Sequence, residues 1–235
     1  DLVKDIADRS KNINWIRLLY LNPKRVDDKL IKLIKDNDKV CKYIDLPIQH
    51  INNRILKLMN RNNAKHEIIS LIKHIRKEIP EVTIRTSVIV GFPTETDTEF
   101  EELLDFIREI RFERLGAFIY SHEEGTPAYD FSGQIDEAVK QKRFDALMQE
   151  QLSISGEVNR DKIGKIIDVL IEKEEEGCVP LSPEARYVGR SHADAPEVDG
   201  CVFVKSDDKL SCGDIVKVKV IKSYEYDLVG EKASS

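Results

Sequence analysis

The stretch Val82-Thr83-Ile84-Arg85-Thr86-Ser87-Val88-Ile89-Val90, followed by Gly91-Phe92-Pro93, decides the fold. Most of its side chains are β-branched, which is typical of a strand buried on both faces of a parallel sheet. Gly91 and Pro93 end this strand. Thr96 and Glu99 then have the spacing of a helix capping box ahead of an apolar helical stripe. The stretch therefore predicts a buried strand that leads directly into a helix.

The same alternation of strand and helix extends on both sides of this stretch. Three further strands are predicted at Trp15–Leu21, Tyr43–Ile48 and Arg114–Tyr120. Further helices are predicted at residues 26–36, 54–60, 67–79 and 135–162. Successive strand and helix units form right-handed crossovers and a parallel sheet. We therefore expect residues 1–162 to form an α/β domain, a partial parallel barrel with a trailing helix.

Residues 163–235 have a different pattern. Short apolar segments alternate there with turns that contain Gly177, Pro180, Pro183, Gly200 and Gly213. The five predicted strands are residues 166–171, 187–189, 201–204, 215–223 and 227–231. Five short strands without a helix predict a small antiparallel β-barrel. This segment has 10 basic and 15 acidic residues, net −5, whereas residues 1–162 have 27 and 28, net −1.

The composition is that of a soluble globular protein. The 235 residues are 41% hydrophobic and 34% charged, and the net charge is −6. No apolar run approaches the roughly 20 residues that a membrane helix needs, and the first ten residues lack the apolar centre of a signal peptide. We therefore expect a cytoplasmic protein without membrane contact. Because the chain begins with Asp1 and not with Met, we expect a piece of a longer protein.

The four cysteines predict neither a metal site nor a disulfide. Cys41, Cys178, Cys201 and Cys212 lack the tight spacing of zinc or cluster ligands. Disulfides are also rare in cytosolic proteins. We expect four reduced thiols and no metal ligand in this chain.

Polar residues gather where the predicted strands end, which is where parallel α/β barrels place their reactive groups. Because alternate residues of a strand share a face, Arg85 and Ser87 are expected on the face toward a barrel interior. Asp45 has the matching position on the preceding strand. An interior arginine needs a carboxylate or a bound anion. Arg85 therefore either forms a structural ion pair with Asp45 or binds a ligand.

Two histidines also lie at predicted strand ends. Gln49-His50 follows the second strand, and His122-Glu123-Glu124 follows the fourth. Gln49-His50 either lines a ligand site or starts the next helix. His122 is either an acid–base or metal group or part of an exposed polar loop. The spacing alone leaves these alternatives open, and no phosphate-loop, esterase or dinucleotide motif is present.

Four segments together resemble the second half of the radical S-adenosylmethionine (SAM) domain of methylthiotransferases. They are Asp45-Leu46-Pro47-Ile48-Gln49-His50, Leu58-Met59-Asn60-Arg61, residues 85–96 (RTSVIVGFPTET) and residues 120–129 (YSHEEGTPAY). The C-terminal β module is similar to the TRAM domain that ends these enzymes. The resemblance covers essentially the whole chain. It implies a partial barrel of the radical SAM type followed by an OB-like barrel.

Within this family, the chain resembles the branch that modifies an aspartate of ribosomal protein S twelve (RimO-like). The tRNA adenosine branch (MiaB-like) typically has Leu-Pro-x-Gln-Ser-Gly and an Arg-Pro-Gly-Thr-like loop, where this chain has Gln49-His50 and residues 121–126 (SHEEGT). Residues 195–200 (APEVDG) also look like the RimO-like branch. An RNA-binding module needs a basic face, whereas a net charge of −5 suits a basic protein partner.

The resemblance implies that a 5′-deoxyadenosyl radical, made from SAM, abstracts hydrogen from the β-carbon of the aspartate before a methylthio group is inserted. Two 4Fe-4S clusters are expected in the full-length parent and none is ligated by this chain, because both cysteine triads of the family are absent. The chain alone is expected to be inactive. Gln49, Arg85, Ser87 and Tyr120 are then candidates to bind SAM. His50 and His122 are candidates for the mouth of the barrel near the substrate.

The expected partner is ribosomal protein S twelve or the small ribosomal subunit, and direct binding of nucleic acid is the less favoured reading. One alternative is a tRNA methylthiotransferase, whose TRAM domain binds an anticodon arm with a steep salt dependence. Another is a non-catalytic module that binds a protein and uses the partial barrel as a scaffold.

Overall fold

The computed structural model describes residues 2–175 and 181–233. The chain divides into two compact units, Asp1–Gln151 and Leu152–Ser235. The division falls inside the helix α6 (Glu137–Arg160), which covers most of the predicted 135–162. Gly177, Cys178 and Pro180, singled out in the sequence, lie outside the described residues.

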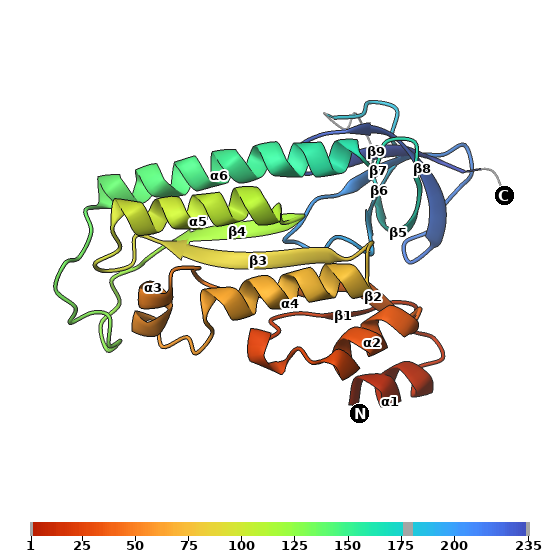
Figure 1. Cartoon of the computed structure of the whole chain (residues 1–235). Coiled ribbons are helices and arrows are strands. Elements are labelled where there is room, and N and C mark those ends of the chain that lie inside the picture. The colour runs from red at the N-terminus through yellow and green to blue at the C-terminus, as the bar shows by residue number, and fades with distance from the viewer. Residues whose placement is uncertain (1, 176–180, 234–235) are drawn as a thin grey trace. The chain divides into compact units, whose positions relative to one another are not determined.

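The first unit contains a four-stranded parallel sheet (Figure 1). Its strands, in spatial order, are β1 (Ile16–Leu18), β2 (Val40–Asp45), β3 (Thr83–Val90) and β4 (Arg114–Ile119). β3 is an inner strand paired on both edges, and Ile84, Val88 and Val90 are completely buried. The predicted α/β class with a parallel sheet is confirmed.

Helices connect these strands, and α4 and α5 run along the sheet (Figure 1). They are α1 (Leu2–Arg9), the 3-10 turn η1 (Pro23–Arg25), α2 (Asp28–Asp36), α3 (Asn53–Leu58), α4 (Lys65–Glu78) and α5 (Asp97–Ile110). The predicted capping box starts α5, because the Thr96 side chain accepts from the Glu99 amide and the Glu99 carboxylate accepts from the Thr96 amide. The sequence pattern did not predict α1, and Ala7 is the buried residue of this helix.

β2 begins and ends earlier than the predicted Tyr43–Ile48. The strand already starts at Val40, and the regular ladder ends at Asp45. Pro47 has no amide hydrogen to donate to a ladder, and Gln49 has a left-handed backbone, with φ of 70°. Gln49 nevertheless returns to the sheet as an isolated parallel bridge to Val88. The segment after β2 is thereby attached to the C-terminal part of β3.

The second unit contains a closed five-stranded barrel. Its strands are β5 (Ile166–Glu174), β6 (Tyr187–Ser191), β7 (Val202–Lys205), β8 (Ile215–Ser223) and β9 (Leu228–Lys232), and the order around the barrel is β5-β6-β7-β9-β8. Four of the five pairings are antiparallel, as expected, whereas β7 and β9 pair in parallel because β9 inserts between β8 and β7. Inward-facing residues such as Val169, Val202 and Val218 are completely buried and form its core.

Two further findings concern the described residues only. No described helix is both long and apolar enough to span a membrane. Cys41, Cys201 and Cys212 are free thiols, and Cys41 is buried.

Candidate functional site

One face of the parallel sheet has polar side chains. Asp45 and Arg85 are register partners on β2 and β3, and Arg85 Nη1 lies 3.1 Å from Asp45 Oδ1. The other carboxylate oxygen of Asp45 accepts from the Tyr20 amide at 2.9 Å, and Ser87 Oγ lies 3.5 Å from Arg85 Nη1. Only 11% of the Arg85 side chain and 2% of the Asp45 side chain are exposed. The ion pair expected from strand parity is therefore present.

Two polar groups flank the C-terminal end of β3. The Gln49 amide donates to the Ser87 carbonyl at 2.9 Å on one side, and the Tyr120 amide donates to the Val90 carbonyl at 3.0 Å on the other. The side-chain amide of Gln49 has no hydrogen-bond partner among the described residues. The Tyr120 hydroxyl is buried and also has no partner within the part of the chain described. Only 9% of Tyr120 is exposed.

These groups fit a polar cofactor such as SAM. A buried hydroxyl without a partner costs free energy that a ligand atom would recover. Tyr120 Oη is such a group, Gln49 is only partly buried, and the Arg85 guanidinium is paired with Asp45. Of the four predicted cofactor-binding residues, Arg85 lies in the first half of β3 and Ser87 in its second half, while Gln49 and Tyr120 flank the C-terminal end of the strand.

His50 lies in a buried network and not at an open mouth. The ring is completely buried, its Nδ1 accepts from the Asn52 amide at 3.0 Å, and its Nε2 therefore donates to Glu95 Oε1 at 3.0 Å. The second carboxylate oxygen of Glu95 accepts from the Gly91 amide at 2.6 Å and from Arg143 Nη1 at 2.8 Å. Because both ring nitrogens are engaged, the geometry supports a positioning role for His50, in place of the expected contact with substrate.

The sequence pattern missed Glu95 and Arg143. Two charged residues of α6, Lys140 and Arg143, are buried, at 2% and 6% exposed. The buried stripe of α6 also includes Gln151 and Ser155. A stripe of polar residues gives no hydrophobic periodicity, so this inward face was not visible in the sequence.

Lys140 forms a second contact between α6 and the turn after β3. Its Nζ donates to the Tyr120 carbonyl at 3.3 Å and pairs with Glu137 at 2.6 Å. Gly91 has a φ of +73°, and a β-carbon there would lie 2.4 Å from Lys140 Cγ. Position 91 therefore requires glycine, both for its backbone and for the close approach of Lys140.

His122 is exposed, on the loop between β4 and α6. Its ring stacks on Tyr129 with a centroid distance of 4.2 Å, and its Nε2 donates to the Tyr129 carbonyl at 2.9 Å. Glu123 accepts from the Ser121 hydroxyl within the same loop. His122 is therefore exposed, with one ring nitrogen used by its own loop, and its place near the substrate stays a prediction.

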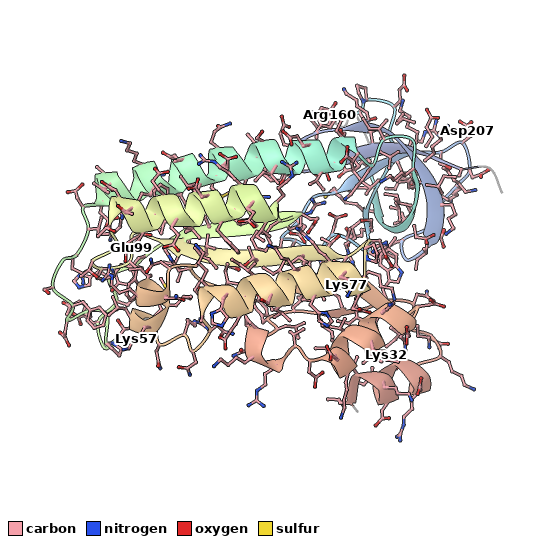
Figure 2. The ribbon with its side chains drawn as sticks, viewed as in Figure 1. Lys32, Lys57, Lys77, Glu99, Arg160 and Asp207 are labelled. Carbon is pink, nitrogen blue, oxygen red and sulfur yellow. The ribbon has the colours of Figure 1, made fainter. Side chains whose placement is uncertain are left out.

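An arginine ties α3 to the start of α5. Arg54 donates to both carboxylate oxygens of Glu99 at 2.6–2.7 Å and to the carbonyl of Thr94 at 2.8 Å. This hydrogen bond lowers the pKa of Glu99 to about 2, and burial partly opposes the shift. Figure 2 shows Glu99 and Lys57 of α3 at the same end of the first unit. The pair fixes the helices that surround the turn after β3.

No cluster of three or more histidine, cysteine or carboxylate residues is arranged for a metal ion within residues 2–175 and 181–233. A SAM-type ligand fits the donors described above, and the cluster ligands implied by the resemblance are not part of this site.

Comparisons with known proteins agree with this geometry. Residues 1–107 match the family model of the radical SAM superfamily, and residues 163–232 match that of the TRAM domain. The chain is 48% identical over 98% of its length to the ribosomal protein uS12 methylthiotransferase RimO of Clostridium botulinum (strain Loch Maree / Type A3), and 49% identical over the same share to RimO of Thermoanaerobacter sp. (strain X514). It spans about half the length of these curated relatives, 50% in each case.

Solved structures give a second comparison. The radical SAM enzyme coproporphyrinogen III oxidase (HemN) of Escherichia coli aligns with a TM-score of 0.50 and 19% identity. The alignment covers 60% of this chain and 32% of that enzyme. At this identity the likeness concerns the fold alone.

Proposed function

Since the chain belongs to the radical SAM methylthiotransferase family, we propose that it forms the C-terminal half of an enzyme that methylthiolates the β-carbon of an aspartate in ribosomal protein uS12, in the cytoplasm. When bound, SAM would supply the radical that abstracts hydrogen and the methyl of the methylthio group, with the iron–sulfur clusters held by the full-length parent. We assign cofactor binding to residues 1–162 and substrate capture to residues 163–235. The chain by itself is inactive in this proposal.

The observation that supports cofactor binding most strongly is the unpaired polar capacity around β3. Arg85, oriented by Asp45, supplies a cation for the carboxylate of SAM. The buried Tyr120 hydroxyl, which has no partner among the described residues, and the side-chain amide of Gln49 supply hydrogen bonds. The Glu95 network holds the turn after β3 in place through His50 and Arg143. These residues bind and orient, while His122 lies exposed on the loop beyond β4.

The charge of the barrel supports a basic protein as the substrate. A groove at one end of the second unit is lined by more acidic than basic side chains. The acidic ones are Glu174, Glu175, Glu184, Asp207, Asp208 and Glu231. Of the three basic lining residues, Lys205 pairs with Glu184 and Lys232 pairs with Asp208, while Arg186 is exposed, so the six acidic residues outnumber the basic ones. Opposite charges across an interface favour correct association and disfavour polyanions such as RNA.

Binding measurements on this chain test the substrate assignment. Fluorescence anisotropy would be recorded across a salt series with labelled uS12 and, in parallel, with a tRNA anticodon stem-loop. We expect tighter binding to uS12, weakened by Asp207→Asn with Asp208→Asn, and unchanged by Lys29→Gln with Lys77→Gln on the first unit. A preference for the RNA with a steep salt slope would instead assign the chain to the tRNA-modifying branch. Binding to neither would exclude substrate capture by residues 163–235.

A further inference from the structure

A small cavity lies beside the C-terminal ends of β1 and β2, in the first unit. Its volume is about 110 Å³. Because a water molecule takes about 30 Å³ in the liquid, the cavity suits a group of a few heavy atoms. Its polar lining residues are Asn22, Lys24, Asn60, Arg61, Asn62 and Asn63, and its apolar ones are Pro23, Pro47, Ile48 and Ile68.

The lining contains cations and amides but no carboxylate, although the chain has 43 acidic residues. Neither Lys24 Nζ nor the Arg61 guanidinium has an ion-pair or hydrogen-bond partner among the described residues. Two cations close to this part of the chain are paired, Arg54 with Glu99 and Lys65 with Glu102. The two unpaired cations of the cavity are therefore available to a ligand.

The backbone holds Arg61 at the cavity. Asn60 has a left-handed φ of 54°, and the Arg61 amide donates to the Leu56 carbonyl at 2.8 Å, which closes the end of α3. Glu67, an acidic group that interacts with Lys24, is outside the lining. The Glu67 carboxylate accepts from the Ala64 amide at 2.7 Å and so is already engaged in capping α4.

We propose that this cavity is a subsite for a small oxyanion, and that it binds a side-chain carboxylate of the protein substrate beside the C-terminal ends of β1 and β2. A planar guanidinium forms two parallel hydrogen bonds to a carboxylate or phosphate. The ammonium of Lys24 and the side-chain amides of the asparagines add further donors, and the lining has no carboxylate that would repel an anion. Binding of an oxyanion does not depend on the proposed function; the choice of a substrate carboxylate as its source does. The segment Leu58-Met59-Asn60-Arg61, which the SAM site does not use, thereby gains a role.

In the first test, the isotope-labelled chain is titrated with inorganic phosphate, and the NMR chemical shifts of its backbone amides are recorded at each step. We expect saturable shifts at residues 22–24 and 60–63. Lys24→Gln with Arg61→Gln should weaken binding at least about tenfold, which is about 1.4 kcal/mol. Lys77→Gln with Lys142→Gln removes the same charge elsewhere and should leave binding unchanged. Lys77 is near the other end of α4, about 20 Å from its start at 1.5 Å per residue (Figure 2).

A single variant tests the same site without removing its cations. Asn63→Asp adds a carboxylate to the lining and should abolish the shifts while leaving the fold intact. Shifts that are spread over the surface, or that are equal in the variant and the control, would show no such site. This result would leave the binding of uS12 by residues 163–235 unaffected, so each proposal can be contradicted without contradicting the other.

The second test identifies the source of the oxyanion. The peptide N-acetyl-Gly-Asp-Gly-amide should produce the same shifts as phosphate, and N-acetyl-Gly-Asn-Gly-amide should produce none. Shifts with phosphate but with neither peptide would overturn the substrate carboxylate as the source.

Discussion

The side chain of Glu95 joins three elements of the first unit at one buried point. Its oxygens accept from His50 after β2, from the amide of Gly91 after β3, and from Arg143 on α6. The side chain of Glu95 is completely buried and that of Arg143 is 7% exposed. A buried ion pair that loses one partner leaves an uncompensated charge. The network therefore makes the turn after β3 depend on a single arginine.

Arg143→Met should lower the free energy of unfolding by about 3–5 kcal/mol, because the Glu95 carboxylate would remain buried without its cation. Arg108→Met is the matched control. Arg108 is 47% exposed and pairs with Asp105 and Glu150 at the surface, so its loss should cost about 1 kcal/mol or less. Urea denaturation followed by circular dichroism measures both. Equal losses in the two variants would mean that the Glu95 network adds no stability.

Arg85→Ala should weaken SAM binding in the full-length parent. The variant removes the cation that Asp45 orients on β3, and the loss of a hydrogen bond to a charged group is worth about 1.5–3 kcal/mol, or roughly 10- to 100-fold in the dissociation constant. Isothermal titration calorimetry measures it. An unchanged SAM affinity, with the fold intact, would leave Arg85 a purely structural partner of Asp45.

For single residues, the sequence predicted those contacts that depend on the alternation of side chains between the two faces of a strand. It placed Arg85 opposite Asp45 because both lie on regular strands with a period of two. It could not place Glu95 with Arg143, since the two are 48 positions apart and meet through helix packing. His50 was expected at an open mouth, and its burial follows from the same packing of α6 against the turn after β3.

Among the elements, the start of α5 should respond to acid. The pKa of Glu99 is lowered to about 2 from 4.5 in the folded state, so unfolding takes up a proton as the pH falls. This contribution to stability is fully present above about pH 4.5 and is lost as the pH falls toward 2. Thermal unfolding between pH 6 and pH 2 should therefore show a steeper loss for the natural chain than for Glu99→Gln. Parallel curves for the two proteins would contradict the assignment.

Close packing in the barrel also has an element-scale test. A β-carbon at Gly189 on β6 would lie 2.2 Å from the Leu170 carbonyl oxygen, a backbone atom that cannot swing away. Gly189→Ala should therefore destabilise the second unit by about 1–3 kcal/mol. Gly156 lies on α6 with its nearest contact at 3.9 Å, so Gly156→Ala should stabilise by about 0.5–1 kcal/mol. Differential scanning calorimetry of both variants checks the sign, and a neutral Gly189→Ala would disprove the close approach.

The sequence predicted the existence of most elements but not all of their ends. β8 has the predicted bounds, residues 215–223, because inward valines and outward lysines alternate from Val216 to Val220, although the register shifts between Val220 and Lys222. β2 was predicted about three residues late, since Pro47 and the left-handed Gln49 interrupt a stretch whose apolar residues continue. The parallel pairing of β7 with β9 was not predicted, because strand spacing does not reveal which strand inserts between two others.

For the whole molecule, we propose that this chain belongs to an enzyme that modifies a ribosomal protein and not an RNA. The chain covers half of each relative at 48–49% identity, so the reaction must be measured on the full-length parent. That protein would be incubated anaerobically with SAM, a reductant and either uS12 or tRNA, and the products digested and analysed by mass spectrometry. We expect one methylthio group on an aspartate of uS12 and none on the tRNA. A methylthio group on adenosine of the tRNA, with uS12 unmodified, would contradict it.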